Sequence, residues 1–327
     1  MQRRQFLSLS LGSFAAATVG THADAQAAYP SRPIKLVVPF SAGGVNDIVG
    51  RQWAEKMKSS LGSVYVENQG GAGGTLGTAR ASRADPDGYT LLLHHVALAS
   101  SASLYRKLPF DPATSFVGVG LITDVPMTIV GKADLKPDTI GELLDYIRTN
   151  KDQVTYAHAG VGSASHLCGM LFQDALDVQM TTVPYKGTGP AMTDLLGGQV
   201  EMMCDQTTNT VGHIKSGKIK SYAVTTKNRL AVLPDLPTLD ESGLKDFEVT
   251  IWHGLFAPKG TPGDVVDKLA AALQTALKDP RVIERFAQLG IEPVTPERAT
   301  PAVLDQHLQA EIAKWKPVIQ AAGVYAD

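Results

Sequence analysis

Three glycine-rich segments of this sequence combine backbone N–H groups with hydroxyl and amide side chains, and none contains lysine or arginine. They span residues 39–47, 68–75 and 159–166, each between a predicted strand and a predicted helix. Consecutive glycines let several N–H groups converge, and a helix N-terminus adds a partial positive charge, so such loops can bind a small anion. No Gly-Lys-Ser/Thr follows them, and the second lacks the G-x-G-x-x-G spacing of a dinucleotide site. The three loops therefore predict a carboxylate-sized anion site.

Two adjacent histidines, His94 and His95, end a predicted strand, and His166 follows Ser165 at the start of a predicted helix. Adjacent strand residues point to opposite faces, and no H-E-x-x-H spacing accompanies the pair, so a metal site is disfavoured. Contact of one ring with a ligand and plain packing of both remain the two alternatives. Ser165 lacks the G-x-S-x-G elbow of a hydrolase nucleophile, so we expect His166 near a cleft rather than in catalysis.

Five further polar or reactive residues have simpler interpretations. Asp47 falls in the first turn of a predicted helix, where a carboxylate complements the helix dipole. Asp205 ends a predicted strand and is a candidate for the cleft, whereas Lys186 is expected to brace its own loop. Cys168 and Cys204 can pair in an oxidising compartment. Because helix and strand placement does not establish their separation, two buried free thiols are expected.

Short apolar runs alternate with helical periods from residue 34 onward, which predicts βαβ units and parallel sheets. Strands are expected at residues 34–39, 64–66, 89–93, 116–122, 127–130, 154–157, 181–183, 200–204, 219–225 and 250–256. Helices are expected at residues 141–149, 165–175 and 190–196, and three more follow residue 261, the last disturbed at Pro317. No linker separates two halves, so two α/β lobes joined by strands crossing at residues 120–126 and 225–250 would form a clamp around a cleft.

The composition narrows the class of partner. The 327 residues carry 30 basic and 32 acidic side chains, and 6% are aromatic. A basic stripe or an aromatic platform for nucleic acid is therefore not expected, and two cysteines exclude a four-cysteine zinc site. Residues 1–27 have Arg3 and Arg4 before an apolar run and small residues, as in an export signal of the Sec or twin-arginine type. No later stretch is apolar enough to span a membrane, so we expect a periplasmic protein.

Ordered segments along nearly all of residues 29–324 resemble the mature solute receptors of tripartite tricarboxylate transporters, the Bug family. The resemblance begins at residues 29–34 and 38–40, with Gly43, Gly44 and Asp47. It continues at residues 66–68, 71–74, 86–92, 163–166, 183–190, 194–200, 233–238, 254–258 and 311–315. So many segments in the same order make the resemblance specific.

This resemblance implies a periplasmic clamp of two lobes that captures a small carboxylate and delivers it to a membrane permease, with no catalysis, cofactor or metal. We expect one lobe at residues 28–124 and 252–327, the other at 125–251, and a monomer. The implied ligand is a di- or tricarboxylate or an aromatic carboxylate. Thr207 and Trp252 are further candidates for the outer part of the ligand. The expected ligand-binding residues are Phe40, Ser41, Ala42, Gly43, Gly44, Asn46, His94, His95, Gly160, Gly162, Ser163, Ala164, Ser165, His166, Tyr185, Thr188, Asp205 and Gln206.

The sequence departs from the family pattern at positions that bear on the ligand. Ala42 replaces a frequent proline, and the pairs His94-His95 and Trp252-His253 are unusual, which suggests a distal pocket adapted to a particular ligand. Two other functions share some of these features. One is a ligand sensor that feeds a signalling receptor, and the other is an exported hydrolase that uses Ser165.

Overall fold

The computed structural model describes residues 29–151 and 153–326, so the predicted export signal lies outside the described residues. The first lobe is built on three parallel strands in the order β2-β1-β3. The run Ile34–Val38 is almost wholly buried, as an apolar strand covered on both faces should be. These elements are β1 (Ile34–Val38), α1 (Val45–Leu61), β2 (Val64–Asn68), η1 (Ala72–Gly74), α2 (Thr75–Ser82), β3 (Thr90–His95) and α3 (Val96–Leu104).

The second lobe repeats this plan with the parallel strands β6-β5-β7. Its first helix starts at a capping box, in which the Thr139 hydroxyl and the Glu142 carboxylate each accept a backbone N–H at the helix start. These elements are α4 (Ile140–Asn150), β5 (Thr155–His158), α5 (Ala164–Leu176), β6 (Thr181–Pro184), α6 (Thr188–Leu196), β7 (Met202–Gln206), α7 (Thr207–Lys215) and β8 (Ile219–Val224).

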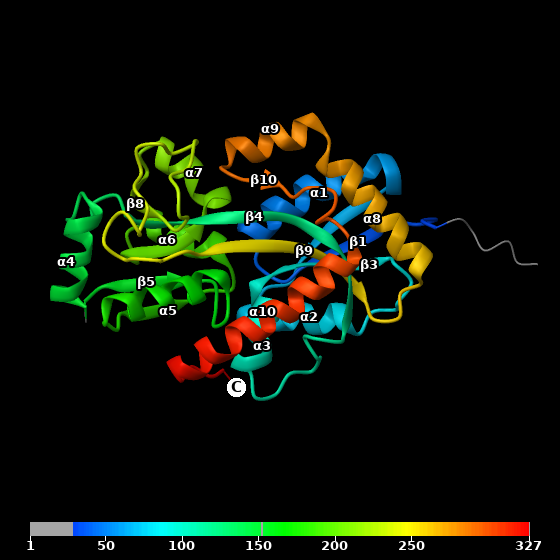
Figure 1. Ribbon diagram of the computed structural model, residues 1–327, viewed down its shortest axis with the longest axis horizontal. Coiled ribbons are helices and arrows are strands. Elements are labelled where there is room, and N and C mark those ends of the chain that lie inside the picture. The colour runs from blue at the N-terminus through cyan, green and yellow to red at the C-terminus, as the bar shows by residue number, and fades with distance from the viewer. Residues whose placement is uncertain (1–28, 152, 327) are drawn as a thin grey trace, which may run out of the picture.

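Two long antiparallel strands, β4 (Phe116–Lys132) and β9 (Thr250–Pro258), run between the lobes (Figure 1). The start of β4 pairs with β9, and from Met127 onward it pairs with β7 and β8. The prediction of two separate strands at 116–122 and 127–130 was therefore wrong, because residues 123–126 between them also pair with β9. The crossing at 120–126 is confirmed. The second crossing is made by β9, while residues 225–249 stay hydrogen-bonded near β8.

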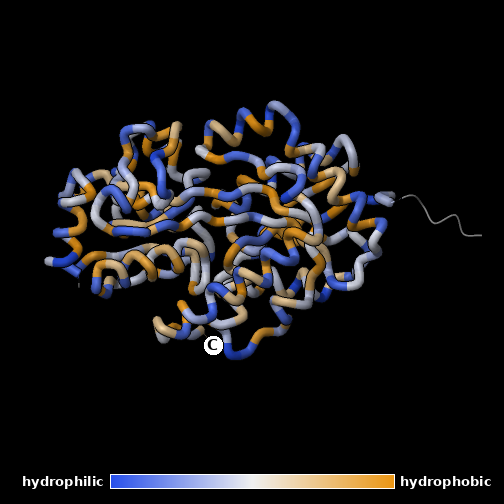
Figure 2. Tube along the Cα trace, in the orientation of Figure 1, coloured by the Kyte–Doolittle hydropathy of each residue, from blue (hydrophilic) through white to orange (hydrophobic). Residues whose placement is uncertain are grey.

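The C-terminal segment returns to the first lobe as α8 (Gly263–Leu277), α9 (Pro280–Gln288), β10 (Glu292–Pro293) and α10 (Pro301–Ala322). Hydrophobic and hydrophilic residues alternate along α9 in Figure 2, in keeping with its burial of only Val282 and Phe286. Helix α10 contains Pro317 and runs on beyond it to Ala322. None of the helices in the described residues is long and apolar enough to cross a membrane.

The two cysteines form a disulfide, which corrects the expectation of free thiols. Helix α5 lies over the sheet next to β7, so Cys168 and Cys204 face each other with a Cα–Cα distance of 6.2 Å. That separation lies within the usual range for a disulfide. The bond fastens α5 to the strand that precedes α7, and both helices begin at the space between the lobes.

Candidate functional site

Two of the three glycine-rich loops line one enclosed space between the lobes. This space has a volume of about 10 Å³, the room of a single water molecule, and we call it the cleft. Its walls come from the loop after β1, the start of α1 and the end of β3 in the first lobe, and from the strand-to-helix turns of the second. The lining residues are Phe40, Val45, Asn46, His95, Ala159, Ser163, Ala164, Ser165, Thr188 and Gln206. The third loop, 68–75, lies outside this lining.

Four helices begin at the cleft. Val45 and Asn46 open α1, Ala164 and Ser165 open α5, Thr188 opens α6, and Gln206 is the residue before α7. Only α5 has a side-chain cap among them, the Ser163 hydroxyl, which accepts from His166 N. Helix N-termini carry unpaired N–H groups and partial positive charge, so they favour a negatively charged group. The lining includes no lysine or arginine, so a carboxylate here would rely on N–H groups, hydroxyls and water.

The first ligand loop, residues 39–47, is held by a carboxylate. Gly43, at φ 78°, donates its N–H to Asp47 Oδ2 at 3.0 Å, and Arg51 Nε lies 2.9 Å from Asp47 Oδ1. Burial alone would raise the pKa of Asp47. The hydrogen bonds from Arg51 and Gly43 outweigh this effect, so that its pKa lies below the ordinary value. Asp47 therefore braces the loop in addition to complementing the dipole of α1.

The second ligand loop, residues 159–166, is held by neutral groups. Gly160 donates its N–H to His158 Nδ1 at 3.2 Å, and Gly162 donates to His166 Nδ1 at 3.3 Å. Ser165 Oγ accepts from Ala159 N at 2.9 Å. His158 was absent from the sequence-based candidates. The signal that could have found it is its place at the end of a strand, immediately before a glycine-rich turn.

The adjacent histidines differ in their positions. His95 lines the cleft, stacks on Phe40 with ring centroids 4.9 Å apart, and caps α3 by accepting from Ala97 N. His94 is buried outside the lining, and burial lowers its pKa to about 3. His253 lies opposite His95 on the paired strand β9, with its Nε2 3.1 Å from Asn46 Oδ1. The described residues contain no group of three metal-ligating side chains arranged to hold an ion.

Several predicted residues are occupied elsewhere. Tyr185 turns away from the cleft and donates its hydroxyl to Asp194 Oδ2 at 2.6 Å. Asp205 is fully buried, which raises its pKa to about 7, and it accepts hydrogen bonds from Gln206 N and Asn209 Nδ2. It thus fixes the start of α7. The predicted residues outside the lining are Ser41, Ala42, Gly43, Gly44, His94, Gly160, Gly162, His166, Tyr185 and Asp205.

The lining adds Val45 and Ala159 to the predicted residues. Of the residues expected at the outer part of the ligand, Trp252 instead donates its indole N–H to Glu311 Oε2 on α10 at 3.1 Å.

Several buried polar atoms at or beside the cleft have no partner among the described residues, and such atoms require a ligand or water. They are Asn46 Nδ2, Gln206 Oε1, Thr207 Oγ1, Thr208 Oγ1 and His253 Nδ1.

Direct hydrogen bonds hold the two lobes together around the cleft. Ser41 N donates to Lys186 O at 3.2 Å, and Val45 N donates to the Thr188 hydroxyl at 3.3 Å. Lys186 thus meets the first lobe through its carbonyl. Ser100 Oγ donates to Gly162 O at 2.9 Å. This arrangement is closed, because the cleft is smaller than any dicarboxylate and the lobes touch on both sides of it.

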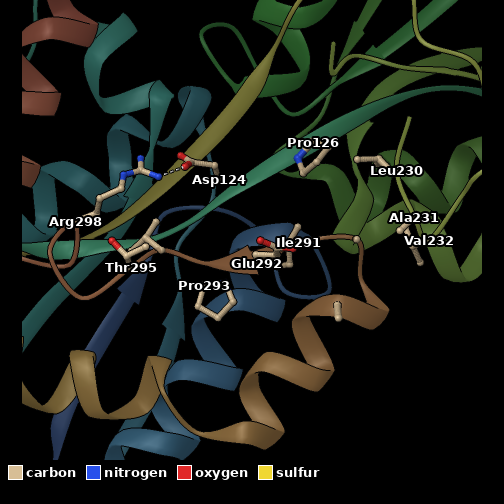
Figure 3. Close-up of a pocket in the computed structure, with 13 residues that line it drawn as sticks. Asp124, Pro126, Leu230, Ala231, Val232, Ile291, Glu292, Pro293, Thr295 and Arg298 are labelled. Atoms are coloured by element: carbon tan, nitrogen blue, oxygen red, sulfur yellow. Dashed lines mark hydrogen bonds and ion pairs between the residues drawn. The ribbon is translucent and has the colours of Figure 1, made fainter. Parts of the chain in front are cut away.

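A second space between the lobes lies at the crossing strand β4 and has a volume of about 490 Å³ (Figure 3). Residues 230–232 of the second lobe face residues 290–295 of the first across it. Its charged groups include Asp124 and Arg298, which pair with each other at 2.5 Å. Because this pair is already satisfied and none of the four helix starts reaches the space, the cleft is the stronger candidate for a carboxylate.

Comparison with known proteins agrees with this geometry. A sequence model of the tripartite tricarboxylate transporter family receptor matches residues 49–324. The chain is 55% identical over 302 residues to a protein encoded in the TAR-I ttuE-ttuC' intergenic region of Agrobacterium vitis, covering 92% of this chain and 87% of that protein.

Two solved structures share the fold closely. The periplasmic binding protein BugD is 52% identical, with a TM-score of 0.89 over 91% of this chain and 100% of BugD. MatC from Rhodopseudomonas palustris, solved with bound malate, is 40% identical, with a TM-score of 0.86 over 89% of this chain and 100% of MatC. The expected two-lobed clamp is confirmed by these similarities. The chain belongs to the receptor family of the tripartite tricarboxylate transporters.

Proposed function

We propose that this protein captures a small carboxylate in the cleft and passes it, as a monomer, to the membrane permease of a tripartite transporter. The observation that carries the proposal is the meeting of four helix N-termini at a buried space that contains unpartnered polar atoms. Within each lobe the helices hold these N–H groups in a fixed direction, so little local reorganisation opposes binding. Membership of this family implies a periplasmic location, which residues 1–27 would secure as an export signal.

The binding mechanism we propose is closure of two lobes about β4 and β9. We place the first lobe at residues 28–124 and 252–327 and the second at 125–251. The change of pairing partners supports this division, because Pro126 is the last β4 residue paired with β9 and Met127 is the first paired with β7. One ligand carboxylate would lie against Asn46 and the start of α5, with Gln206 and His95 at its outer part.

The proposed ligand is a short dicarboxylate of the malate type. MatC, the 40% identical receptor, was solved with malate bound. The hydroxyl, amide and imidazole side chains in the cleft lining suit the carboxylates and the hydroxyl of such a ligand. A hydrolase finds no support in the geometry. Ser165 Oγ accepts from Ala159 N, and the His166 ring accepts from Gly162 N, so neither is arranged as nucleophile and base.

The test is calorimetric and thermal titration of the mature protein, unfolded and refolded to remove co-purified ligand, with malate, succinate, citrate, benzoate and phthalate. A ligand at about 100 times its Kd should stabilise the protein by roughly 2.7 kcal/mol. Asn46→Ala should weaken malate binding about tenfold, because it removes a buried partner at the cleft. Asn150→Ala, at the end of α4, is the matched control and should bind normally. If none of the five carboxylates shifts the unfolding temperature, the proposal is wrong.

A further inference from the structure

We propose that His158 and His166 are positioning residues for the second ligand loop, and that they make retention of the ligand sensitive to acid. This inference rests on the proposed function, since it concerns the loop that would bind the carboxylate. Neither residue lines the cleft. They act on it through the backbone of Gly160 and Gly162.

The hydrogen bonds of His158 and His166 determine the protonation state of both rings. His158 Nδ1 accepts the Gly160 N–H at 3.2 Å, and His166 Nδ1 accepts the Gly162 N–H at 3.3 Å. An imidazole nitrogen that accepts a hydrogen bond carries no proton, so both rings are neutral with the proton on Nε2. Each glycine sits in the left-handed region, at φ 104° and 82°, which an L side chain rarely adopts. The rings therefore hold the N–H groups of these two turns, while Ser165 and Ser100 hold the Ala159 N–H and the Gly162 carbonyl.

Holding these turns sets the direction of the groups that meet the ligand. Gly162 directly precedes Ser163, the N-cap of α5, and Ala164 and Ser165 then line the cleft. The Gly162 carbonyl also accepts from Ser100 Oγ of the first lobe, so the same turn belongs to the closed contact. A shift of the backbone at Gly160 or Gly162 would therefore displace the start of α5 and also weaken the contact between the two lobes.

Protonation is incompatible with this arrangement. A proton on Nδ1 would place two N–H donors against each other, and both hydrogen bonds would be lost. The ring centroids lie only 4.8 Å apart, so two charged rings would also repel. Burial lowers the pKa of both residues, and for His166, with a further contribution from His158, it falls to about 4. In the closed loop these two histidines bind fewer protons than in an open one. Acid therefore favours the open loop, and ligand binding weakens as pH falls from about 6.5 toward 4.

The charged groups near His158 and His166 would only partly neutralise two protonated rings. His158 and His166 border a groove of about 920 Å³, and its charged lining among the described residues is Lys151 at the end of α4 with Asp174 and Asp177 at the end of α5. Among the described C-terminal residues, the groove is lined by the apolar Ala322, which ends α10, and Val324. One cation and two carboxylates thus face the groove, while His158 itself is 2% exposed. The remaining buried histidines near the cleft, on β3 and β9, belong to the first lobe and are left unchanged in the test.

The test compares two double variants by malate titration between pH 7.5 and pH 5. In His158→Asn with His166→Asn, the Oδ1 atoms can accept the same hydrogen bonds but do not titrate. We expect affinity within about twofold of the parent at pH 7.5, and a fall toward pH 5 about tenfold smaller than the parent's. His158→Phe with His166→Phe lacks the acceptors and should bind at least tenfold more weakly at both pH values. An unchanged pH profile in the Asn variant would overturn the proposal.

A second readout needs no ligand. Nitrogen-15 spectra of the histidine-labelled parent at pH 7.5 should show both rings with the proton on Nε2. On acidification, the Gly160 and Gly162 amide signals should shift together with the rings. Rings found with the proton on Nδ1 would contradict the inference directly. Failure of all carboxylates to bind, with the expected spectra retained, would instead count against the proposed function alone.

Discussion

The two ligand loops share one plan but differ in what holds them. Both run from a parallel strand through glycines of positive φ into a helix N-terminus. In the first lobe the support is a carboxylate, Asp47, paired with Arg51. In the second lobe it is two neutral imidazoles, His158 and His166. An ionised carboxylate with a lowered pKa needs no change of protonation for the loop to form in mild acid, whereas an imidazole acceptor must be held neutral below its ordinary pKa, which weakens binding. The support of the loop is therefore insensitive to mild acid in the first lobe and sensitive to it in the second.

The lobes also differ in covalent support. The disulfide Cys168–Cys204 fastens α5, which carries the second ligand loop, to β7. The first ligand loop is fastened by packing of α1, whose Val49, Trp53 and Met57 are buried. The described residues of the first lobe contain no cysteine. The lobe with the titratable loop is thus also the lobe that relies on a cross-link.

The largest expected effect comes from removing that cross-link. Cys168→Ala with Cys204→Ala frees a sequence separation of 36 residues, for which the chain-entropy relation gives about 4 kcal/mol. Denaturant unfolding should show this loss, while malate affinity at 25 °C stays within a few fold because the native contacts remain. Unchanged stability would mean that packing alone holds α5, and that the lobes do not differ in this respect. The parent treated with reductant serves as the comparison for the variant.

Blocking closure should have the next largest effect. A Cβ on Gly73 would overlap the Val161 carbonyl oxygen across the lobes, so Gly73→Ala should bind malate about 100-fold more weakly by calorimetry. Gly323→Ala is the matched control. Gly323 has φ 64° and ψ 19° against 61° and 17° for Gly73, but nothing lies within 4 Å of its added Cβ. Both variants carry the left-handed strain of roughly 1–2 kcal/mol, and only one obstructs the second lobe. Equal affinities would show that closure is not required for binding.

The effect of the Asp47 charge on the first ligand loop can be measured separately from the effect of its hydrogen bond with Gly43. Asp47→Asn retains an acceptor for the Gly43 N–H and should bind within about threefold of the parent, whereas Asp47→Ala should lose about tenfold. Because the pKa of Asp47 is lowered, its support is present above the ordinary carboxylate pKa and is lost only as pH falls through the lowered value. Malate titrations from pH 7.5 to 5 should therefore give the same profile for Asp47→Asn and the parent. A steeper loss in the parent would remove the contrast between the loops.

The alternation of strands and helices and the two ligand loops could be predicted from the sequence, because apolar periodicity and glycine clusters are local signals. The single strand β4 could not, since the polar interval around Asp124 is bridged by pairing with β9, a partner more than 100 residues away. The disulfide likewise depends on how α5 packs over β7. Tyr185 was misplaced because its hydroxyl bonds to Asp194, near the end of α6. His158 was missed because it ends a buried strand and gives no polar pattern of its own.

The smallest effect tests the hydrogen bond between Val45 of the first ligand loop and Thr188, a residue of the second lobe that lines the cleft. The Thr188 hydroxyl accepts from Val45 N at 3.3 Å, and Thr188 is 8% exposed. Thr188→Val keeps the shape but leaves a helix N–H without its partner, so malate affinity should fall about fivefold, equivalent to about 1 kcal/mol. Thr193→Val, on the exposed face of the same helix, should bind normally. Because the Asp47-supported loop makes this contact, the loss should be the same at pH 7.5 and pH 5. A loss that grows in acid would instead show that closure couples the two loops, and that the histidine-supported loop governs both.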